Sequence, residues 1–268
     1  MNTFIIKNKL LSLIVPTYKQ ARTINRDLRN IDKVLKSSLD GVKYEIICVV
    51  DGEVDRTYKE AKKIRNPRIK VFSYSQNRGK GYAVRFGMAR ARGDLISFLD
   101  AGMEISPASI TMLMAHMQWY NADIIVGSKR HPASRVNYPL RRHIFSIGYH
   151  ILVKILFGLS VKDTQSGIKV FKRRVVEKVL PRLFVKKYAM DIEILAVANL
   201  LGFTRIYEAP IEVKFNKRTS RINWQTILRM MIDTLAVFYR LRILEYYSDY
   251  NKKSWLNDPE LKFNISLR

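Results

Sequence analysis

Cysteine and histidine are scarce in this chain of 268 residues. The single cysteine, Cys48, lies inside an apolar run, which indicates a buried core position and excludes a disulfide framework. None of the four histidines stands out as a catalytic base. Internal repeats and low-complexity segments are also missing, while the hydrophobic share of 47% is enough for a sizeable core. The sequence therefore indicates a folded domain that holds together without covalent cross-links.

Long apolar runs are missing as well. Residues 144–159 form the most apolar helix candidate, but they include Lys154 and fall short of the roughly 20 residues that a membrane span needs. Residues 227–244 are interrupted by four charged side chains. Residues 4–15 are broken by two lysines and lead straight into Pro16, unlike a secretory signal. We expect a cytoplasmic protein, peripheral to the cytoplasmic face of a membrane, that does not cross it.

Acidic residues are few, and the net charge is +25. Residues 127–187 contain fifteen Lys or Arg but two acids. Such a charge suggests an anionic partner: nucleic acid, anionic lipid or a phosphorylated substrate. The same stretch contains the apolar helix candidate, which favours an anionic membrane surface. A solvated basic face over a core helix is the alternative. Because nucleic-acid binding would rest on charge alone, without a recognised motif, we expect no nucleic-acid partner.

Short apolar runs alternate with helical patterns along the first half of the chain. Strands are expected at residues 11–15, 44–50, 69–73, 95–99 and 123–126, and helices at residues 21–39, 55–64 and 81–91 and after Ser106-Pro107. The second half predicts a helix at residues 144–159, a strand around Val170, a helix at residues 190–201, a strand pair near Ile206 and Val213, and a final helix at residues 224–247. This order predicts an α/β fold with a mixed, mainly parallel sheet flanked by helices.

Polar segments follow the expected strands at residues 16–20, 51–55, 77–81 and 100–104. Ligands of parallel sheets bind at the carboxyl ends of the strands, so these segments should converge on one crevice. Asp100 and Glu104 are candidate ligands for Mg²⁺ or Mn²⁺, which prefer oxygen and neutralise phosphates. A helix cap and a surface acid are the simpler interpretation of this pair.

Other residues are less specific on their own. Asp51 could accept hydrogen bonds from a base or ribose, or form an Asx turn. Lys80 stands between glycines at a helix start, where it could meet phosphate or simply belong to a turn. Asp191 and Glu193 lie two apart on an apolar helix, so at most one should point toward the core. Acids so close to apolar neighbours need a partner, and a nearby basic residue is the simplest.

Several segments together form an ordered set: Val15-Pro16-Thr17-Tyr18, Val49-Val50-Asp51-Gly52, Asn77-Arg78-Gly79-Lys80-Gly81 with Ala83-Val84-Arg85, Gly93-Asp94 leading to Phe98-Leu99-Asp100-Ala101, Gly127-Ser128-Lys129, Asp163-Thr164-Gln165-Ser166-Gly167-Ile168-Lys169, Ala189-Met190-Asp191-Ile192-Glu193 and Ser220-Arg221. In this order they resemble glycosyltransferase family 2, which has the GT-A fold. The resemblance covers about residues 11–241. It is strongest to the polyprenyl-phosphate branch, whose acceptors include dolichyl phosphate, and the Asp-Thr-Gln-Ser-Gly-x-Lys element at residues 163–169 is similar to its glucosyl-type enzymes.

The resemblance implies a role for each matching residue. The nucleotide-sugar donor would be held by Pro16, Tyr18, Gln20, Asp51, Lys80, Ala101, Ser220 and Arg221. The acceptor phosphate would meet Lys129, Arg142 and Ser146. The catalytic group would consist of Asp100, Gln165, Asp191 and Glu193. The metal, Mg²⁺ or Mn²⁺, would bind Asp100. The family usually reads Asp-x-Asp at that motif, whereas this chain has Gly102 in the second place, so Glu104 is the candidate for the missing oxygen ligand.

The expected reaction is the inverting transfer of a hexose, from a donor of the UDP-glucose or GDP-mannose type, to a polyprenyl phosphate at the membrane surface. A phosphate acceptor is already anionic at neutral pH, so no strong general base is required. A saccharide acceptor is an alternative, and would need Asp191 or Glu193 as base. A degenerate module that binds nucleotide sugar without catalysis is another, supported by Gly102. The expected organisation is a catalytic domain over residues 1–215 with an interfacial helix near residues 141–159, a loop and amphipathic helix over residues 216–250, and a polar tail over residues 251–268.

Overall fold

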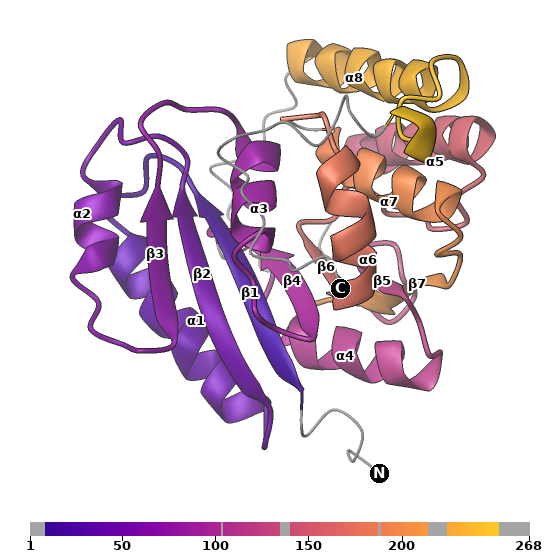
Figure 1. Cartoon of the computed structure of the whole chain (residues 1–268). Helices are drawn as coiled ribbons and strands as arrows, with labels where there is room; N and C mark the ends of the chain where they lie inside the picture. Colours follow the sequence, from indigo (N-terminus) through magenta and orange to yellow (C-terminus); the bar gives the residue numbers. More distant parts are fainter. Residues whose placement is uncertain (1–8, 103, 135–139, 187–188, 214–223, 252–268) are drawn as a thin grey trace.

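The computed structural model describes residues 9–102, 104–134, 140–186, 189–213 and 224–251, and a seven-stranded sheet forms the centre of this part of the chain (Figure 1). The strand order is β3-β2-β1-β4-β6-β5-β7. The strands are β1 (Leu10–Thr17), β2 (Lys43–Val50), β3 (Ile69–Ser73), β4 (Leu95–Leu99), β5 (Ile124–Ser128), β6 (Ile168–Lys172) and β7 (Ile206–Pro210). Strand β6 is antiparallel to β4 and β5, and the other pairs are parallel. The expected α/β class with a mixed, mainly parallel sheet is confirmed.

Helices cover both faces of the sheet, because alternate residues of each strand point to opposite sides. Leu13 of β1 lies in a core shared with α1 and α4, whereas its neighbour Ile14 lies in a second core with α3, α6 and α7. The described helices are α1 (Ile24–Ser38), α2 (Thr57–Lys62), α3 (Lys80–Met88), α4 (Ser109–Trp119), α5 (Leu140–Phe157), α6 (Arg173–Val179), α7 (Met190–Leu200) and α8 (Trp224–Arg242), with short 3₁₀ turns η1 (Leu180–Arg182) and η3 (Asp249–Asn251).

The structure departs from the local expectations at three points. Helix α4 begins at Ser109, because the backbone around Ser106-Pro107 forms a turn in which the Ser106 carbonyl accepts the Ser109 N–H at 2.9 Å. Helix α6 and η1 were not predicted. Ile206 and Val213 do not pair with each other: β7 runs parallel to β5, and Val213 bridges to Ile105.

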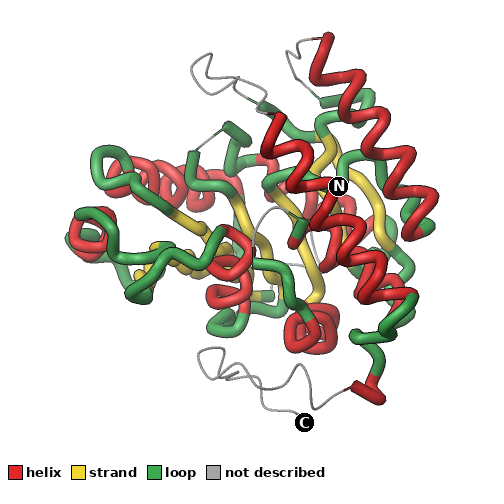
Figure 2. The backbone as a smooth tube through the Cα atoms, turned by 90° about the horizontal axis from the view of Figure 1, so that it is seen from above, coloured by secondary structure: helices red, strands yellow, loops and turns green. Residues whose placement is uncertain are grey.

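Helices α5 and α8 lie together at one end of the molecule, above α7 in Figure 1, and the view from above also shows long helices side by side there (Figure 2). The rings of Phe157 and Phe238 meet edge to face at 6.1 Å, and the hydroxyls of Tyr149 and Thr234 are hydrogen-bonded at 2.9 Å. Within the described ranges, no helix combines the length and the apolar character needed to cross a membrane.

Candidate active site

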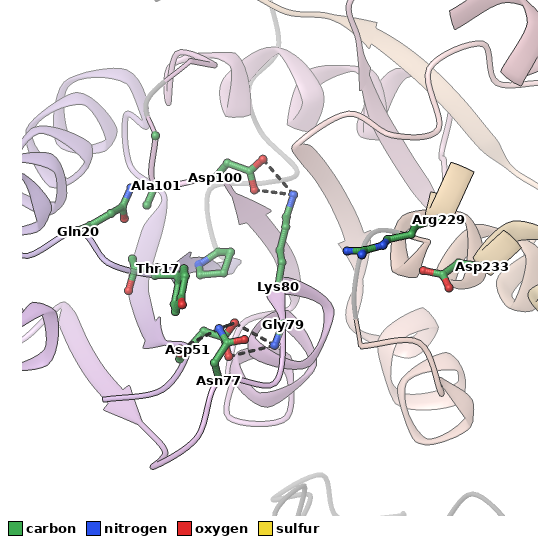
Figure 3. Close-up of a pocket in the computed structure, with 13 residues that line it drawn as sticks. Thr17, Gln20, Asp51, Asn77, Gly79, Lys80, Asp100, Ala101, Arg229 and Asp233 are labelled. Atoms are coloured by element: carbon green, nitrogen blue, oxygen red, sulfur yellow. Dashed lines mark hydrogen bonds and ion pairs between the residues drawn. The ribbon is translucent and has the colours of Figure 1, made fainter. Parts of the chain in front are cut away.

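A cavity of about 670 Å³ opens at the carboxyl ends of β1, β2 and β4, where the sequence predicted the crevice (Figure 3). Seven of the predicted site residues line it: Pro16, Tyr18, Gln20, Asp51, Lys80, Asp100 and Ala101. The remaining lining residues were not predicted as site residues: Thr17, Asn77, Gly79, Gly102, Arg229 and Asp233. The rule that ligands bind at the carboxyl ends of parallel strands (the strand-end rule) therefore correctly predicted that residues up to 85 positions apart in the sequence share one cavity.

Asp51 is buried at the floor of the cavity and holds the loop that leads into α3. Its carboxylate accepts hydrogen bonds from the hydroxyl of Tyr74 (2.8 Å), the amide of Asn77 (2.8 Å) and the backbone N–H groups of Arg78 (2.8 Å) and Gly79 (3.0 Å). Burial, together with the Asp51 charge, raises the pKa of Tyr74, so that hydroxyl stays a donor. Asp51 thus faces the predicted nucleotide site while its oxygens shape the Gly79-Lys80 turn.

Two glycines allow this turn to approach the end of β2 closely. Gly52 has φ of +84°, and a Cβ there would lie 2.5 Å from the backbone nitrogen of Asn77. Gly79 has φ of +98° and immediately precedes the first residue of α3. Both conformations favour glycine, because a Cβ is disfavoured at positive φ. Within the Gly-Lys-Gly motif, Gly79 is therefore required by the backbone conformation of the turn, and Lys80 supplies its positive charge.

Lys80 and Asp100 form an ion pair in the cavity wall. The Lys80 Nζ lies 2.7 Å from Oδ1 and 3.0 Å from Oδ2 of Asp100, as the dashed lines of Figure 3 mark. Behind the carboxylate, a Cβ at Gly167 would lie 2.4 Å from Oδ2, so only glycine leaves room for Asp100 in this position. The side chains of Lys80 and Asp100 are 33% and 44% exposed, which leaves both accessible from the cavity.

The residues present fit a divalent cation that takes most of its ligands from phosphate and water. Asp100 supplies one accessible carboxylate, while Glu104 is exposed and lies outside the cavity lining. The described residues contain no cluster of three or more His, Cys, Asp or Glu that could enclose a metal. Mg²⁺ in phosphate sites is commonly held by one or two carboxylates together with substrate phosphates. Asp100 could hold such a cation only together with the ligand's own oxygens.

Gln165 and Asp191 lie behind the cavity wall rather than in its lining among the described residues. The amide of Gln165 donates to the Tyr149 hydroxyl at 3.1 Å, which links it to α5. Asp191 forms a buried ion pair with Lys169, whose ammonium also donates to the Ser166 carbonyl at 2.8 Å. Burial lowers the pKa of Lys169, and the Asp191 carboxylate opposes that shift. The expected basic partner of Asp191 is confirmed.

Glu193 is fully buried away from the cavity. Its carboxylate accepts the Tyr247 hydroxyl at 2.6 Å and the backbone N–H groups of Phe184 and Val185 at 3.0 and 2.9 Å. Burial raises its pKa, and these hydrogen bonds oppose the rise. The expectation that at most one of Asp191 and Glu193 points into the core was wrong, because α7 is packed on nearly all sides and buries both. Glu193 ties α7 to the segment that follows α8.

The predicted acceptor-phosphate residues are described only in part. The backbone N–H of Lys129 donates to the Asp163 carboxylate at 2.9 Å, beyond the residues that line the cavity. Arg142 and Ser146 lie on α5, and their side chains are outside the described part of the structure. Ser220 and Arg221, predicted for the donor, also fall outside the described residues.

Arg229 and Asp233 of α8 line the side of the cavity opposite Asp51 (Figure 3). They are two of the four charges that interrupt residues 227–244, and their spacing of four places them on one face of the helix. That spacing was the signal by which sequence analysis could have found them. From the sequence alone, these charges were an argument against a membrane span. The sequence does not specify which way this face of α8 points, because that depends on how the helix packs.

Comparison with known proteins agrees with this geometry. Residues 12–180 match the sequence profile of the family described as "Glycosyl transferase family 2". The chain is 30% identical over 246 residues to a dolichyl-phosphate beta-glucosyltransferase of Drosophila melanogaster, covering 86% of this chain and 74% of that protein. It is also 30% identical over 267 residues to the enzyme of that name from Saccharomyces cerevisiae, covering 91% and 78%.

Solved structures share the fold at lower identity. Mannosyl-3-phosphoglycerate synthase from Rubrobacter xylanophilus superposes with a TM-score of 0.67 at 16% identity, covering 90% of this chain and 76% of that one. Glucosyl-3-phosphoglycerate synthase from Mycobacterium tuberculosis, in complex with Mn²⁺, UDP and phosphoglyceric acid, gives 0.63 at 18%, covering 87% and 78%. These likenesses establish the GT-A fold. With the family profile over most of the chain and relatives at 30% identity, this protein belongs to glycosyl transferase family 2.

Proposed function

We propose that this chain transfers a hexose, with inversion, from a nucleoside diphosphate sugar to a polyprenyl phosphate at a membrane surface. The observation that carries the proposal is one cavity in which Lys80 and Asp100 stand at the strand ends and Arg229 faces them from α8. The names of the relatives favour glucose as the sugar and dolichyl phosphate as the class of acceptor. UDP in the Mycobacterium tuberculosis structure favours UDP-glucose over GDP-mannose as the donor.

The chemistry is a single displacement at the anomeric carbon. An oxygen of the acceptor phosphate forms the new bond to that carbon while the bond to the donor diphosphate breaks and its electron pair leaves with the diphosphate. The acceptor is anionic before it attacks, so the residues mainly have to align the reactants and stabilise the departing charge. In this proposal Lys80 would bind the donor diphosphate, and Arg229, which lines the same cavity from α8, would bind the acceptor phosphate. A divalent cation held at Asp100 would supply further neutralisation of the leaving group.

The burial of the two acids favours a phosphate acceptor over a saccharide. A saccharide hydroxyl would need a general base within hydrogen-bond reach. Asp191 is paired with buried Lys169, and Glu193 is enclosed by Tyr247 and two backbone N–H groups. Neither carboxylate lines the described cavity, so neither is placed to accept a proton from a reactant there.

The outer face of α8 supports the membrane part of the proposal. Large apolar side chains recur on this face at helical spacing and are exposed: Leu228, Met231, Ile232, Leu235 and Tyr239. The opposite face is buried through Thr234, Val237 and Leu241. Ile151 and Ile155 of α5 are exposed too, with Ile155 at 75%. An apolar row flanked by Arg229, Arg242 and Lys154 suits a helix that lies in the headgroup region of an anionic membrane.

A screen of donors and acceptors tests the function. Purified protein would be incubated with UDP-glucose, UDP-galactose or GDP-mannose, a short polyprenyl phosphate, and Mg²⁺ or Mn²⁺, and glycolipid formation would be followed by mass spectrometry. We expect glucosyl transfer to the lipid phosphate and none to free saccharides. Transfer to saccharides alone would contradict the acceptor, and donor binding without any turnover would support the non-catalytic alternative.

A further inference from the structure

The Lys80–Asp100 ion pair has a consequence for the order in which ligands can bind. The carboxylate that the motif assigns to the divalent cation already carries a cation that belongs to the protein, with Nζ 2.7 and 3.0 Å from its two oxygens. Asp100 cannot easily retreat from Lys80, because the Gly167 backbone lies directly behind it and its own N–H donates to the Gly167 carbonyl at 3.3 Å. A metal ion that approaches Asp100 is therefore repelled by the Lys80 ammonium group, which is already paired with the carboxylate.

The described residues that line the cavity provide few other ligands for the cation. Gly102 stands two residues after Asp100, where a second acid would share the charge, and a Cβ there would meet no atom of the described residues within 4 Å. Asp51 is engaged by the Asn77–Gly79 turn, and Asp233 lies on α8 across the cavity (Figure 3). In the absence of other ligands, a dication at Asp100 would leave three positive charges beside one carboxylate, which electrostatic repulsion disfavours.

We propose that Lys80 couples the divalent cation to the nucleoside diphosphate, so that the two bind together and each binds weakly alone. The diphosphate gives Lys80 a new anionic partner and gives the cation oxygen ligands that the described residues do not supply. Moving Lys80 from Asp100 to the diphosphate frees the carboxylate for the metal. The inference rests on the proposed function only in taking a nucleoside diphosphate as the donor's leaving group; it needs no assumption about the acceptor.

Lys80→Met removes the positive charge and keeps the length of the side chain. It therefore separates the coupling by Lys80 from the coupling that arises because the metal binds the phosphate directly. Binding of Mn²⁺ alone, of UDP alone and of both together would be measured by calorimetry, with free Mn²⁺ followed by electron paramagnetic resonance. In the natural protein we expect UDP to tighten Mn²⁺ binding by a factor in the usual range of about 5–150. In Lys80→Met we expect Mn²⁺ alone to bind several-fold more tightly, UDP alone to bind more weakly, and the coupling factor to shrink.

Lys80→Arg keeps the positive charge and should keep the weak binding of Mn²⁺ alone. Lys33→Met removes one charge from the exposed face of α1 and controls for net charge. Thermal unfolding would confirm that each variant is folded. An unchanged affinity of Lys80→Met for Mn²⁺ alone would overturn the coupling role. A natural protein that binds neither UDP nor GDP, with or without Mn²⁺, would instead contradict the donor site and with it the proposed function.

Discussion

Gly102 is the residue at which this chain departs most clearly from the acidic pair expected of its family. Among the described residues the position is open, since an added Cβ would meet none of their atoms within 4 Å. We predict that Gly102→Asp supplies a second carboxylate and lowers the Mn²⁺ concentration for half-maximal UDP binding several-fold. An open surface site of this kind should change the free energy of unfolding by less than about 0.5 kcal/mol. Gly102→Asn is the matched control, and an equal effect of Asn and Asp would show that charge is not the cause.

Glu193 is a residue whose burial should be visible in the pH dependence of stability. Its pKa is raised in the folded protein, chiefly by burial. The folded state therefore holds a proton that the unfolded state releases above its pKa of about 4.3, and stability falls as pH rises through the interval between the two pKa values. We predict that the natural protein loses up to about 1.4 kcal/mol per pH unit in this interval relative to Glu193→Gln. Urea unfolding of both proteins between pH 4 and 7 measures this, and parallel curves would contradict it.

At the scale of elements, the local sequence pattern was sufficient to predict a helix or strand where one or both of its faces are buried. The expected bounds of β3 and β4 coincide with the structure, and α1 lies within the range expected for the first helix. Helix α6 was missed because its seven residues, Arg173–Val179, are too few to show helical periodicity. The antiparallel direction of β6 was equally hidden, since a strand's own sequence does not contain the direction of its neighbours.

Helix α8 gives the prediction that belongs to this scale. Ile232 is 56% exposed in the apolar row of α8, and burying an apolar side chain in a membrane contributes about 0.8 kcal/mol per CH₂ group. We predict that Ile232→Glu lowers the partition coefficient for anionic vesicles by roughly tenfold or more while leaving turnover of a short acceptor in detergent unchanged. Met112→Glu, at an exposed apolar position on α4, is the control and should bind vesicles normally. Equal losses in both variants, measured by co-sedimentation, would contradict a docking role for α8.

At the scale of the whole molecule, the sequence predicted one half of the cavity better than the other. The donor half is built by short segments after β1, β2 and β4, and the strand-end rule is enough to bring Tyr18, Asp51 and Asp100 together. The opposite half comes from α8, more than 120 residues after Asp100. Its place depends on packing against α5 and α7, which no local pattern specifies. Arg229 and Asp233 were therefore missed as lining residues.

The net charge of +25 gives the last prediction, because it acts on the molecule as a whole. Attraction to anionic lipid amounts to about 1 kcal/mol per Lys or Arg near the surface and is screened by salt, whereas the apolar contribution of α8 is much less sensitive to salt. We expect strong binding at about 0.05 M NaCl to vesicles that contain phosphatidylserine, and a steep loss of this binding by about 0.5 M NaCl. Over this ~10-fold change in salt the Debye length shortens about threefold. Binding to neutral vesicles should be weak and insensitive to salt. Ile232→Glu should remove the neutral-vesicle binding and keep the salt dependence. Binding to neutral and anionic vesicles with equal strength would show that the positive charge serves another partner.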